Sequence, residues 1–240
     1  MSVSKKSMKS KTAPYLIGAG VAVVATLAGL ASYAATKPGP PAVVEQQVAA
    51  YPELEKYARR DAADPLAVGR ADAPVVMLEY ADFACGYCGK FARDIEPALI
   101  EKYVEAGVLR IEWRNFPIFG EESERAARAS WAAGRQSRFW QFHKAAYAEG
   151  AKERGFAKDR LLALAREAGV PDLDRFGRDL DSAGARAAVT ADQEQGWSLG
   201  ATSTPSFLVN GRPIAGAQPM ETFASAIESA HASARRGAAK

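Results

Sequence analysis

The chain has 240 residues, of which 48% are hydrophobic and 25% charged, and its formal net charge is +3. This length allows one well-buried domain of roughly 150 to 200 residues together with appendages. The basic excess comes from Lys5, Lys6, Lys9 and Lys11, because residues 37–240 carry a net charge of −1. A domain without a basic surface lacks the electrostatic feature of nucleic-acid-binding proteins, so nucleic acid is excluded as a partner.

An uncharged stretch from Thr12 to Thr36 follows the four lysines and is rich in Leu, Ile, Val, Ala and Gly. About 20 apolar residues suffice to cross a bilayer. The stretch is either a permanent membrane anchor or a signal peptide that is cut after Ser32-Tyr33-Ala34. Its length favours the anchor, since a usual signal core has roughly 7 to 15 residues. We therefore expect residues 1–36 to hold a cytoplasmic basic tail and a transmembrane or signal segment.

In both cases the lysines stay in the cytoplasm and everything from Lys37 onward lies outside it. The protein is then a single-pass membrane protein with an extracytoplasmic domain, or a secreted protein after cleavage. That side of the membrane is where disulfides persist. Residues 37–60 read as a linker, with a stiff Pro38-Gly39-Pro40-Pro41 spacer and a short amphipathic helix over 44–60.

The folded domain is expected over residues 61–234, starting with turn-rich sequence and a strand from Val75 to Tyr80. A helix should begin at Cys85 and continue to Gly107, with a kink at Pro97. Its apolar residues recur at spacings of three and four, as Cys88, Phe91, Ala92, Ile95, Leu99 and Tyr103. A second strand over 108–113 completes a parallel strand-helix-strand unit, which is right-handed.

The pattern is almost entirely helical from about residue 121 to residue 199, which predicts a helical insertion between two parts of a sheet. After it, Ser206 to Val209 and Arg212 to Ala215 flank Asn210-Gly211, the strongest short signal for a β-hairpin. A last helix over 220–232 and a small basic tail at 235–240 close an α/β domain.

The chain has two cysteines, and they stand three residues apart in Cys85-Gly86-Tyr87-Cys88 between the first strand and the first helix. A thiol at the first turn of a helix faces free backbone N–H groups and the positive end of the helix dipole, so its pKa should fall. Zinc would need two more ligands, and His143 and His231 do not have a ligand spacing. A structural disulfide across so short a loop would remove little entropy from the unfolded chain. The pair is therefore predicted to be redox-active, with no metal.

Three features together resemble the thioredoxin superfamily, and within it the DsbA-like extracytoplasmic thiol/disulfide oxidoreductases. They are the segment Asp82-Phe83-Ala84-Cys85-Gly86-Tyr87-Cys88 after a strand, the helical insertion, and Thr204-Pro205-Ser206-Phe207 before a hairpin and a last helix. The resemblance covers about residues 64–232. It implies a thioredoxin-like fold with a helical insertion and protein-disulfide oxidoreductase activity, without a cofactor.

The resemblance also implies roles for residues outside the cysteine pair. Pro205 would be cis and would lie beside the cysteines, where the Thr204 backbone could pair with a substrate chain as an added strand. Glu79 stands six residues before Cys85, where relatives carry a buried acid that exchanges a proton with Cys88. Strand alternation could instead turn Glu79 to solvent. Asp82 reads as a helix cap, and His143 as a structural residue.

Two departures from the family pattern affect the direction of the chemistry. Strongly oxidising members carry histidine at the position of Tyr87, and many relatives carry glycine at the position of Ser203. The expected function is a disulfide oxidase for thiol-containing secreted or cell-surface proteins, reoxidised by a quinone-linked membrane partner of the DsbB or vitamin-K-epoxide-reductase kind. The alternatives are a reductase or isomerase of the same fold, fed by a membrane thiol transporter, and a non-redox chaperone.

Overall fold

The computed structural model describes residues 50–238. The expected membrane-spanning or signal segment and the proline-rich spacer lie outside this range. Within it, no helix combines the length and the apolar character that a membrane crossing requires.

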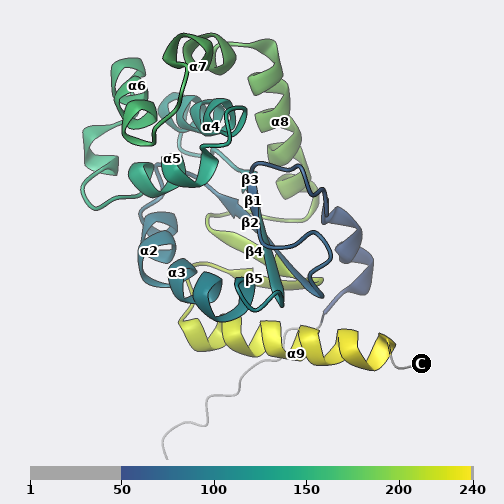
Figure 1. Cartoon of the computed structure of the whole chain (residues 1–240). Helices are drawn as coiled ribbons and strands as arrows, with labels where there is room; N and C mark the ends of the chain where they lie inside the picture. The colour runs from purple at the N-terminus through teal and green to yellow at the C-terminus, as the bar shows by residue number, and fades with distance from the viewer. Residues whose placement is uncertain (1–49, 239–240) are drawn as a thin grey trace, which may run out of the picture. The chain divides into compact units, whose positions relative to one another are not determined.

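A sheet of five strands in the order β1-β3-β2-β4-β5 forms the centre of the described domain (Figure 1). The strands span Ala67–Val68 (β1), Val75–Ala81 (β2), Leu109–Asn115 (β3), Ser206–Val209 (β4) and Arg212–Ala215 (β5). β2 and β3 are parallel, and the other three pairings are antiparallel. Every residue of β2 and β3 is buried, as expected for the central strands of a sheet covered on both faces.

Side chains along the central strands point alternately to the two faces of the sheet, and they belong to separate apolar clusters on those faces. On one face, Val75 and Met77 of β2 join a cluster that also includes Phe91 of the first helix and the buried residues of the last helix. On the other face, Val76 and Leu78 pack with Leu54 and with residues that follow β3 and α8. Because strand side chains point alternately to opposite faces, this division places Glu79 on the same face as Met77.

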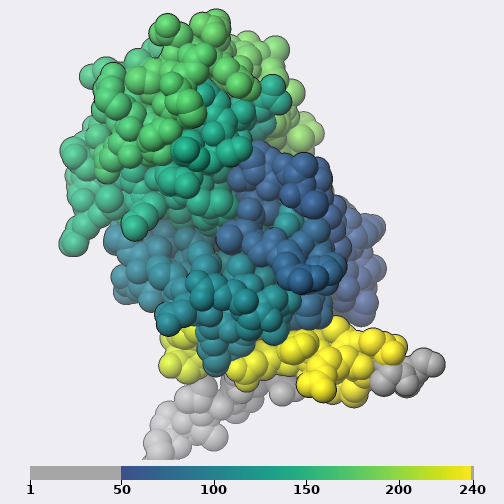
Figure 2. All heavy atoms as spheres, viewed as in Figure 1, coloured from purple at the N-terminus to yellow at the C-terminus, as the bar shows by residue number. Residues whose placement is uncertain are grey.

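The helices surround this sheet in two groups. The first group and the C-terminal helix are α2 (Gly86–Asp94), α3 (Glu96–Leu99), a π-helical turn η2 (Ile100–Val104) and α9 (Met220–Ala238). The insertion consists of α4 (Glu121–Gly134), α5 (Phe139–Ala146), the 3-10 turn η3 (Lys152–Arg154), α6 (Lys158–Glu167), α7 (Leu173–Leu180) and α8 (Ala183–Ser198). The helices of the insertion lie together at the top of Figure 1, and Figure 2 shows their atoms, teal to green, closely packed.

The Asn210-Gly211 turn forms as the sequence predicts. Both residues have positive φ, +40° for Asn210 and +78° for Gly211, which is the geometry that a two-residue hairpin turn requires. A side chain at Gly211 would also collide with the chain, because a Cβ there would lie 2.2 Å from the backbone oxygen of Tyr51. The Asn210 side chain accepts a hydrogen bond from the Val76 N–H at 2.7 Å and so ties the turn to β2.

Three expectations about helix extent are wrong. In the described part of the segment 44–60 there is only a six-residue 3-10 helix, η1 (Pro52–Tyr57), because Pro52 cannot continue an α-helix. The interruption expected at Pro97 is present, but it is a full break at Ile95 rather than a kink: α2 ends at Asp94 and α3, with Pro97 in its first turn, starts at Glu96. The last helix does not give way to a tail at residue 235 but continues to Ala238. Its alanine-rich sequence and the basic Arg235 and Arg236 in the last turn favour this extension.

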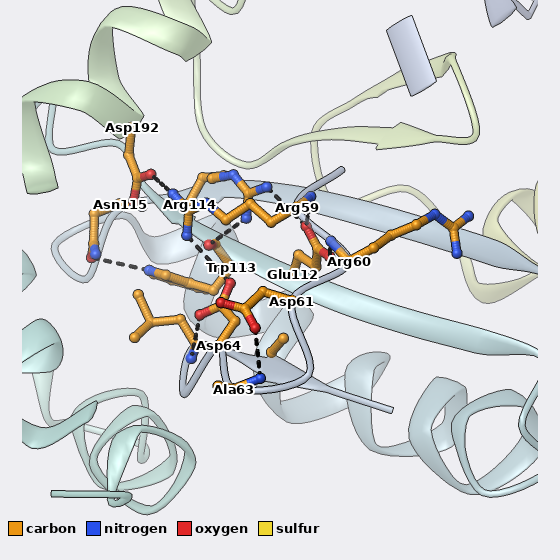
Figure 3. A network of polar contacts seen from close by, with 12 residues as sticks. Arg59, Arg60, Asp61, Ala63, Asp64, Glu112, Trp113, Arg114, Asn115 and Asp192 are labelled. Carbon is orange, nitrogen blue, oxygen red and sulfur yellow. Dashed lines mark hydrogen bonds and ion pairs between the residues drawn. The ribbon is translucent and has the colours of Figure 1, made fainter. Parts of the chain in front are cut away.

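A buried charge network ties the N-terminal segment to β3 and to the insertion (Figure 3). Both oxygens of Glu112 are occupied: they accept backbone N–H groups of Arg59 and Arg60 at 2.8 Å, and side-chain donors of Arg110 and Arg114 at 2.9 Å. Desolvation would raise the pKa of Glu112, but the donors, Arg114 first, outweigh it and hold that pKa at about 2. Glu112 therefore stays ionised inside the protein.

Asp192 on α8 extends this network toward the insertion. It accepts the backbone N–H of Asn115 at 3.0 Å and pairs with the guanidinium of Arg59. The Arg114 guanidinium adds a bond to the side chain of Gln195, also on α8, at 3.1 Å. The side chains of Arg59 and Arg114 and the backbone of Asn115 thus hold α8 against the sheet.

Candidate active site

The two cysteines lie at the start of helix α2, directly after the central strand β2. Cys85 is the N-cap residue of the helix, and its sulfur accepts the backbone N–H of Cys88 at 3.4 Å. Cys85 is 5% exposed and Cys88 is fully buried, and neither is in a disulfide. The first thiol therefore faces the open N-terminal turn of the helix, while the second lies one turn further in.

Asp82 holds the turn that leads into this helix, although it does not cap it. Its carboxylate accepts the N–H groups of Ala84 at 2.8 Å and Ile118 at 2.7 Å, and the hydroxyl of Ser123 at 2.7 Å. The expected role as helix cap is wrong because Cys85 itself occupies the N-cap position. Asp82 instead binds the loop before α2 to the loop before α4, and so fixes the cysteine turn in place.

The two thiols have opposite acidities. The pKa of Cys85 falls to about 6, mainly because the Cys88 thiol donates a hydrogen bond to it, with further donation from the N–H groups of Cys88 and Tyr87. Burial raises the pKa of Cys88 well above its usual value. At neutral pH the pair thus consists of a thiolate at Cys85 and a thiol at Cys88, the asymmetry that stepwise disulfide exchange needs.

The Thr204-Pro205 loop lies directly against the first cysteine. The peptide bond between these two residues is cis, as the family resemblance implies. The Cys85 sulfur lies 3.3 Å from the carbonyl oxygen of Thr204. Strand β4 begins at the next residue, Ser206, so the sheet carries this loop to the cysteines. The structure thus brings Thr204 and Pro205 together with Cys85 and Cys88, the arrangement that the family resemblance implies.

An open cavity of about 400 Å³ adjoins the pair, and we call it the cysteine cavity. Its lining residues are Phe83, Cys85, Gly86, Gly89, Arg93, Ala146, Tyr147, Ala148, Glu149, Gly150, Lys152 and Glu153. The Lys152 ammonium lies beside Gly86, since a Cβ at that glycine would be 3.5 Å from the Lys152 Nζ, an ordinary contact distance. Tyr87, the other residue between the cysteines, is 70% exposed. A partner molecule can thus contact Tyr87 and Lys152 beside Cys85.

Glu79 points into the protein. The sequence leaves open whether this side chain is buried or faces solvent, and the structure shows that it is buried. It is fully buried in the middle of β2, between Trp113 on β3 and Phe207 on β4. Desolvation, and next the nearby Glu96, raise the pKa of Glu79 well above its usual value. At neutral pH Glu79 is therefore a neutral carboxylic acid that can donate a proton.

Sequence reasoning missed two buried polar residues near this acid. Glu96 is 4% exposed at the start of α3, and Tyr147 is 4% exposed just after α5. The one signal for Glu96 was its place on the apolar side of the helical pattern, between Ala92 and Leu99. An acid on a face that otherwise packs inward is unusual enough to mark a site.

The low pKa of Cys85 predicts that the reduced protein depends on pH for its stability. A thiol that titrates at about 6 when folded and near 9.0 when unfolded stabilises the folded state above its unfolded pKa, and loses this contribution as the pH falls through 6. Between pH 5 and pH 7.5 the reduced protein should gain about 2 kcal/mol relative to the oxidised protein. Urea unfolding of both forms at the two pH values measures this difference.

The matched control is the reduced Cys85→Ser variant, which lacks the titrating thiol and should show no such gain. Cys88 does not titrate between pH 5 and pH 7.5, because the ordinary thiol pKa of 9.0 lies above this range and burial raises the folded pKa of Cys88 further. A constant difference between the reduced and oxidised wild type would contradict the low pKa of Cys85.

A thioredoxin-like sheet, with a cysteine pair at the first helix and a cis-proline loop facing it, defines the class of thioredoxin-fold thiol/disulfide oxidoreductases. A family model described as Thioredoxin matches residues 61–229. Probable disulfide bond formation protein D of Bacillus cereus is 32% identical over 150 residues, which cover 60% of this chain and 69% of the relative. The chain belongs to this thioredoxin family, among its DsbA-like members, as its sequence predicts.

Solved structures agree on the fold. BdbD from Bacillus subtilis superposes with a TM-score of 0.65 at 23% identity, covering 70% of this chain and 93% of that protein. A thioredoxin-like oxidoreductase from Silicibacter pomeroyi gives a TM-score of 0.61 at 27% identity, covering 70% and 96%.

The sequence is also similar to part of a much longer protein. The Na(+)/H(+) antiporter NhaA 3 of Salinispora tropica is 35% identical over 169 residues, which are 70% of this chain. The chain spans about a quarter of that antiporter, since the match covers 25% of its length. The similarity therefore concerns one segment of the antiporter.

Proposed function

We propose that this protein is a membrane-anchored extracytoplasmic disulfide oxidase that works through Cys85 and Cys88. The observation that carries the proposal is the asymmetry of the pair: a thiol of low pKa at the helix N-terminus and a buried thiol of high pKa one turn later. Stabilising the Cys85 thiolate stabilises the reduced enzyme, and a more stable reduced form is a stronger oxidant. The anchor rests on the apolar stretch from Thr12 to Thr36.

The oxidised enzyme reacts in two exchange steps. A substrate thiolate attacks the Cys85 sulfur, an S–S bond forms between substrate and Cys85, and the bond to Cys88 breaks. The electron pair goes to Cys88, which takes up a proton because its pKa is high. A second substrate thiolate then attacks the substrate sulfur of the mixed disulfide. Cys85 leaves as its stable thiolate, the substrate is oxidised and the enzyme is a dithiol.

The loop at Thr204 and Pro205 supports a substrate-binding role. The Thr204 carbonyl lies 3.3 Å from the Cys85 sulfur, so an extended substrate chain that pairs with this backbone would bring its own cysteine to Cys85. The substrates are thiol-containing secreted or cell-surface proteins. A membrane redox protein would reoxidise the dithiol, since each turnover leaves the enzyme with two electrons to pass on.

Glu79 serves this reaction as a proton donor to Cys88. Its burial and its raised pKa keep it protonated when Cys88 leaves as a thiolate and requires a proton. Burial, and next the charges of Cys88 and Glu79, raise the pKa of Tyr147 well above its usual value, so its hydroxyl keeps its proton. Tyr147 also lines the cysteine cavity, so it is a candidate for carrying a proton between the acid and the thiol.

The reduction potential of the pair tests the proposal. A Cys85 pKa of about 6 lies between about 3.5 in DsbA and about 7 in thioredoxin. We therefore expect a potential between that of DsbA, about −120 mV, and that of thioredoxin, about −270 mV. Equilibration with glutathione gives the potential, and thiolate absorbance gives the pKa on the same sample. A value at or below that of thioredoxin would contradict an oxidase.

A reductase or isomerase of the same fold is the second candidate, and one observation favours it. Tyr87 stands 70% exposed where strongly oxidising relatives have histidine, so no imidazolium supports the Cys85 thiolate from that position. A potential near that of thioredoxin, together with reduction of scrambled disulfides, would establish this alternative.

A further inference from the structure

Three buried ionisable side chains meet where β2, α3 and α5 come together. Glu79, Glu96 and His143 bring one oxygen or nitrogen atom each to within 4.8 Å of one another. They are 0%, 4% and 2% exposed, and they come from positions far apart in the sequence. Nδ1 of His143 lies 3.7 Å from Oε2 of Glu96, too far for a direct hydrogen bond.

These groups lack the partners that buried polar atoms normally have. Within residues 50–238, several buried atoms here have no hydrogen-bond partner: both carboxyl oxygens of Glu79, Oε1 of Glu96, Nε2 of His143 and the hydroxyl of Tyr147. Leaving such a group unpaired costs about 1 to 3 kcal/mol. A purely structural role therefore does not account for the cluster. Groups that take up and release protons would account for buried polar atoms without hydrogen bonds.

A second cavity of about 570 Å³ reaches the cluster from outside. Its lining residues are Ala92, Arg93, Glu96, Pro97, Ile100, Glu101, Glu105, Trp140, His143, Lys144, Tyr147 and Ala148. Tyr147 and Arg93 line both this second cavity and the cysteine cavity. The Tyr147 ring centroid lies 4.8 Å from that of His143 and 5.0 Å from that of Phe83, which lines the cysteine cavity. Tyr147 therefore adjoins both the cluster and the cysteine cavity.

Burial keeps the whole cluster uncharged at neutral pH. It raises the pKa of Glu96 to about 8 and lowers the pKa of His143 to about 3, while the pKa of Glu79 lies well above its usual value. The charged groups on the surrounding elements are Arg93 on α2, Glu101 and Glu105 beside η2, and Lys144 on α5. Glu96 is the member that solvent in the second cavity can deprotonate and reprotonate near neutral pH.

We propose that Glu96, His143 and Tyr147 form, with Glu79, a proton route that joins Cys88 to solvent through the second cavity. The inference rests on the proposed exchange at Cys85 and Cys88. When the disulfide opens, Cys88 takes a proton from the Tyr147 hydroxyl, which takes one from Glu79. Glu79 is reprotonated by Glu96 through the two nitrogens of neutral His143, and Glu96 takes a proton from solvent. Reoxidation runs the same transfers in reverse.

The route separates proton exchange at Cys88 from thiol exchange at Cys85. The cysteine cavity is where a substrate chain would cover Cys85, and a covered cavity excludes the water that would protonate Cys88. Neither Cys85 nor Gly86 lines the second cavity, whose walls come mainly from α2, α3 and α5, so a substrate chain at Cys85 would leave this cavity open to solvent. Proton transfer can then keep pace with thiol exchange.

The test is single-turnover reduction of the oxidised enzyme by a cysteine peptide, followed across pH in H2O and D2O. The wild type should show an inflection from Glu96 and a solvent isotope effect. Glu96→Gln should remove the inflection and slow the step by about tenfold or more, as loss of a proton-transfer group does. Tyr147→Phe should slow it similarly. Glu101→Gln, which changes an exposed acid on the same cavity, should behave as wild type.

Two further measurements separate proton transfer from mere structural support. The Cys85 pKa by thiolate absorbance should be the same in Glu96→Gln as in wild type. Infrared difference spectra between the oxidised and reduced wild type should contain a protonated-carboxyl band that Glu96→Gln removes. An unchanged pH profile in the variant, or an altered Cys85 pKa, would overturn the route.

Zinc provides a separate check, since the same three side chains could ligate a metal. Tight zinc binding that Glu96→Gln abolishes would make the cluster a metal site and overturn the proton route. Failure of the proposed function is distinguishable, because the wild type itself would then show no disulfide exchange with the peptide.

Discussion

Replacing Cys85 with serine is expected to reduce disulfide transfer to a reduced protein substrate to the uncatalysed level, a loss of at least about a thousandfold. The physical reason is that a serine hydroxyl neither ionises near neutral pH nor forms a disulfide. The remaining Cys88 is fully buried with a raised pKa, so it cannot take over the reaction. The measurement is the rate at which the oxidised protein introduces disulfides into a reduced, unfolded substrate.

Cys88→Ser is the matched control, because it keeps the acidic thiol and removes its partner. This variant should also be inactive as an oxidase, but mass spectrometry should find it in mixed disulfides through Cys85. The chaperone alternative predicts a different pair of results. If Cys85→Ser protects unfolded chains from aggregation as well as the wild type, and the wild type itself oxidises no thiols, the protein is a chaperone rather than an oxidoreductase.

Glu112→Gln is expected to destabilise the protein by about 3 kcal/mol, the effect of removing one partner from a buried ion pair. Each oxygen of Glu112 accepts two donors, one backbone N–H and one arginine group. A glutamine NH2 group would face two of these donors without accepting either. It would also leave Arg110 and Arg114, with 3% and 0% exposed side chains, without a countercharge. Urea denaturation measures the loss.

The decrease in unfolding free energy at acid pH provides an independent check on Glu112. Its pKa is depressed to about 2, so it stabilises the folded state fully above its unfolded pKa of about 4.5 and loses this contribution as the pH falls toward 2. The variant should lose less stability over this range than the wild type. Glu101→Gln removes an exposed acid and should leave the unfolding midpoint unchanged. Equal midpoints for Glu112→Gln and wild type would contradict the structural role of the network.

The sequence by itself determined the order of the elements around the cysteines. Strand β2, the helix start at Cys85, the parallel strand β3 and the Asn210-Gly211 hairpin all follow from short-range signals: periodicity, a capping thiol and residues that accept positive φ. Such signals act within a few residues, so they are readable along the chain. The cysteine pair and Thr204-Pro205 could be linked in advance only through the family resemblance.

Only the tertiary structure decided which polar residues meet inside the domain. The inward direction of Glu79, its approach to Glu96 and His143, and the burial of Glu112 between two arginines depend on contacts between distant segments. No local pattern encodes them, because a charged side chain in a helix or strand is read as exposed unless its partners are known. The packing of α5 and α3 against the sheet desolvates these groups, and desolvation sets their protonation states.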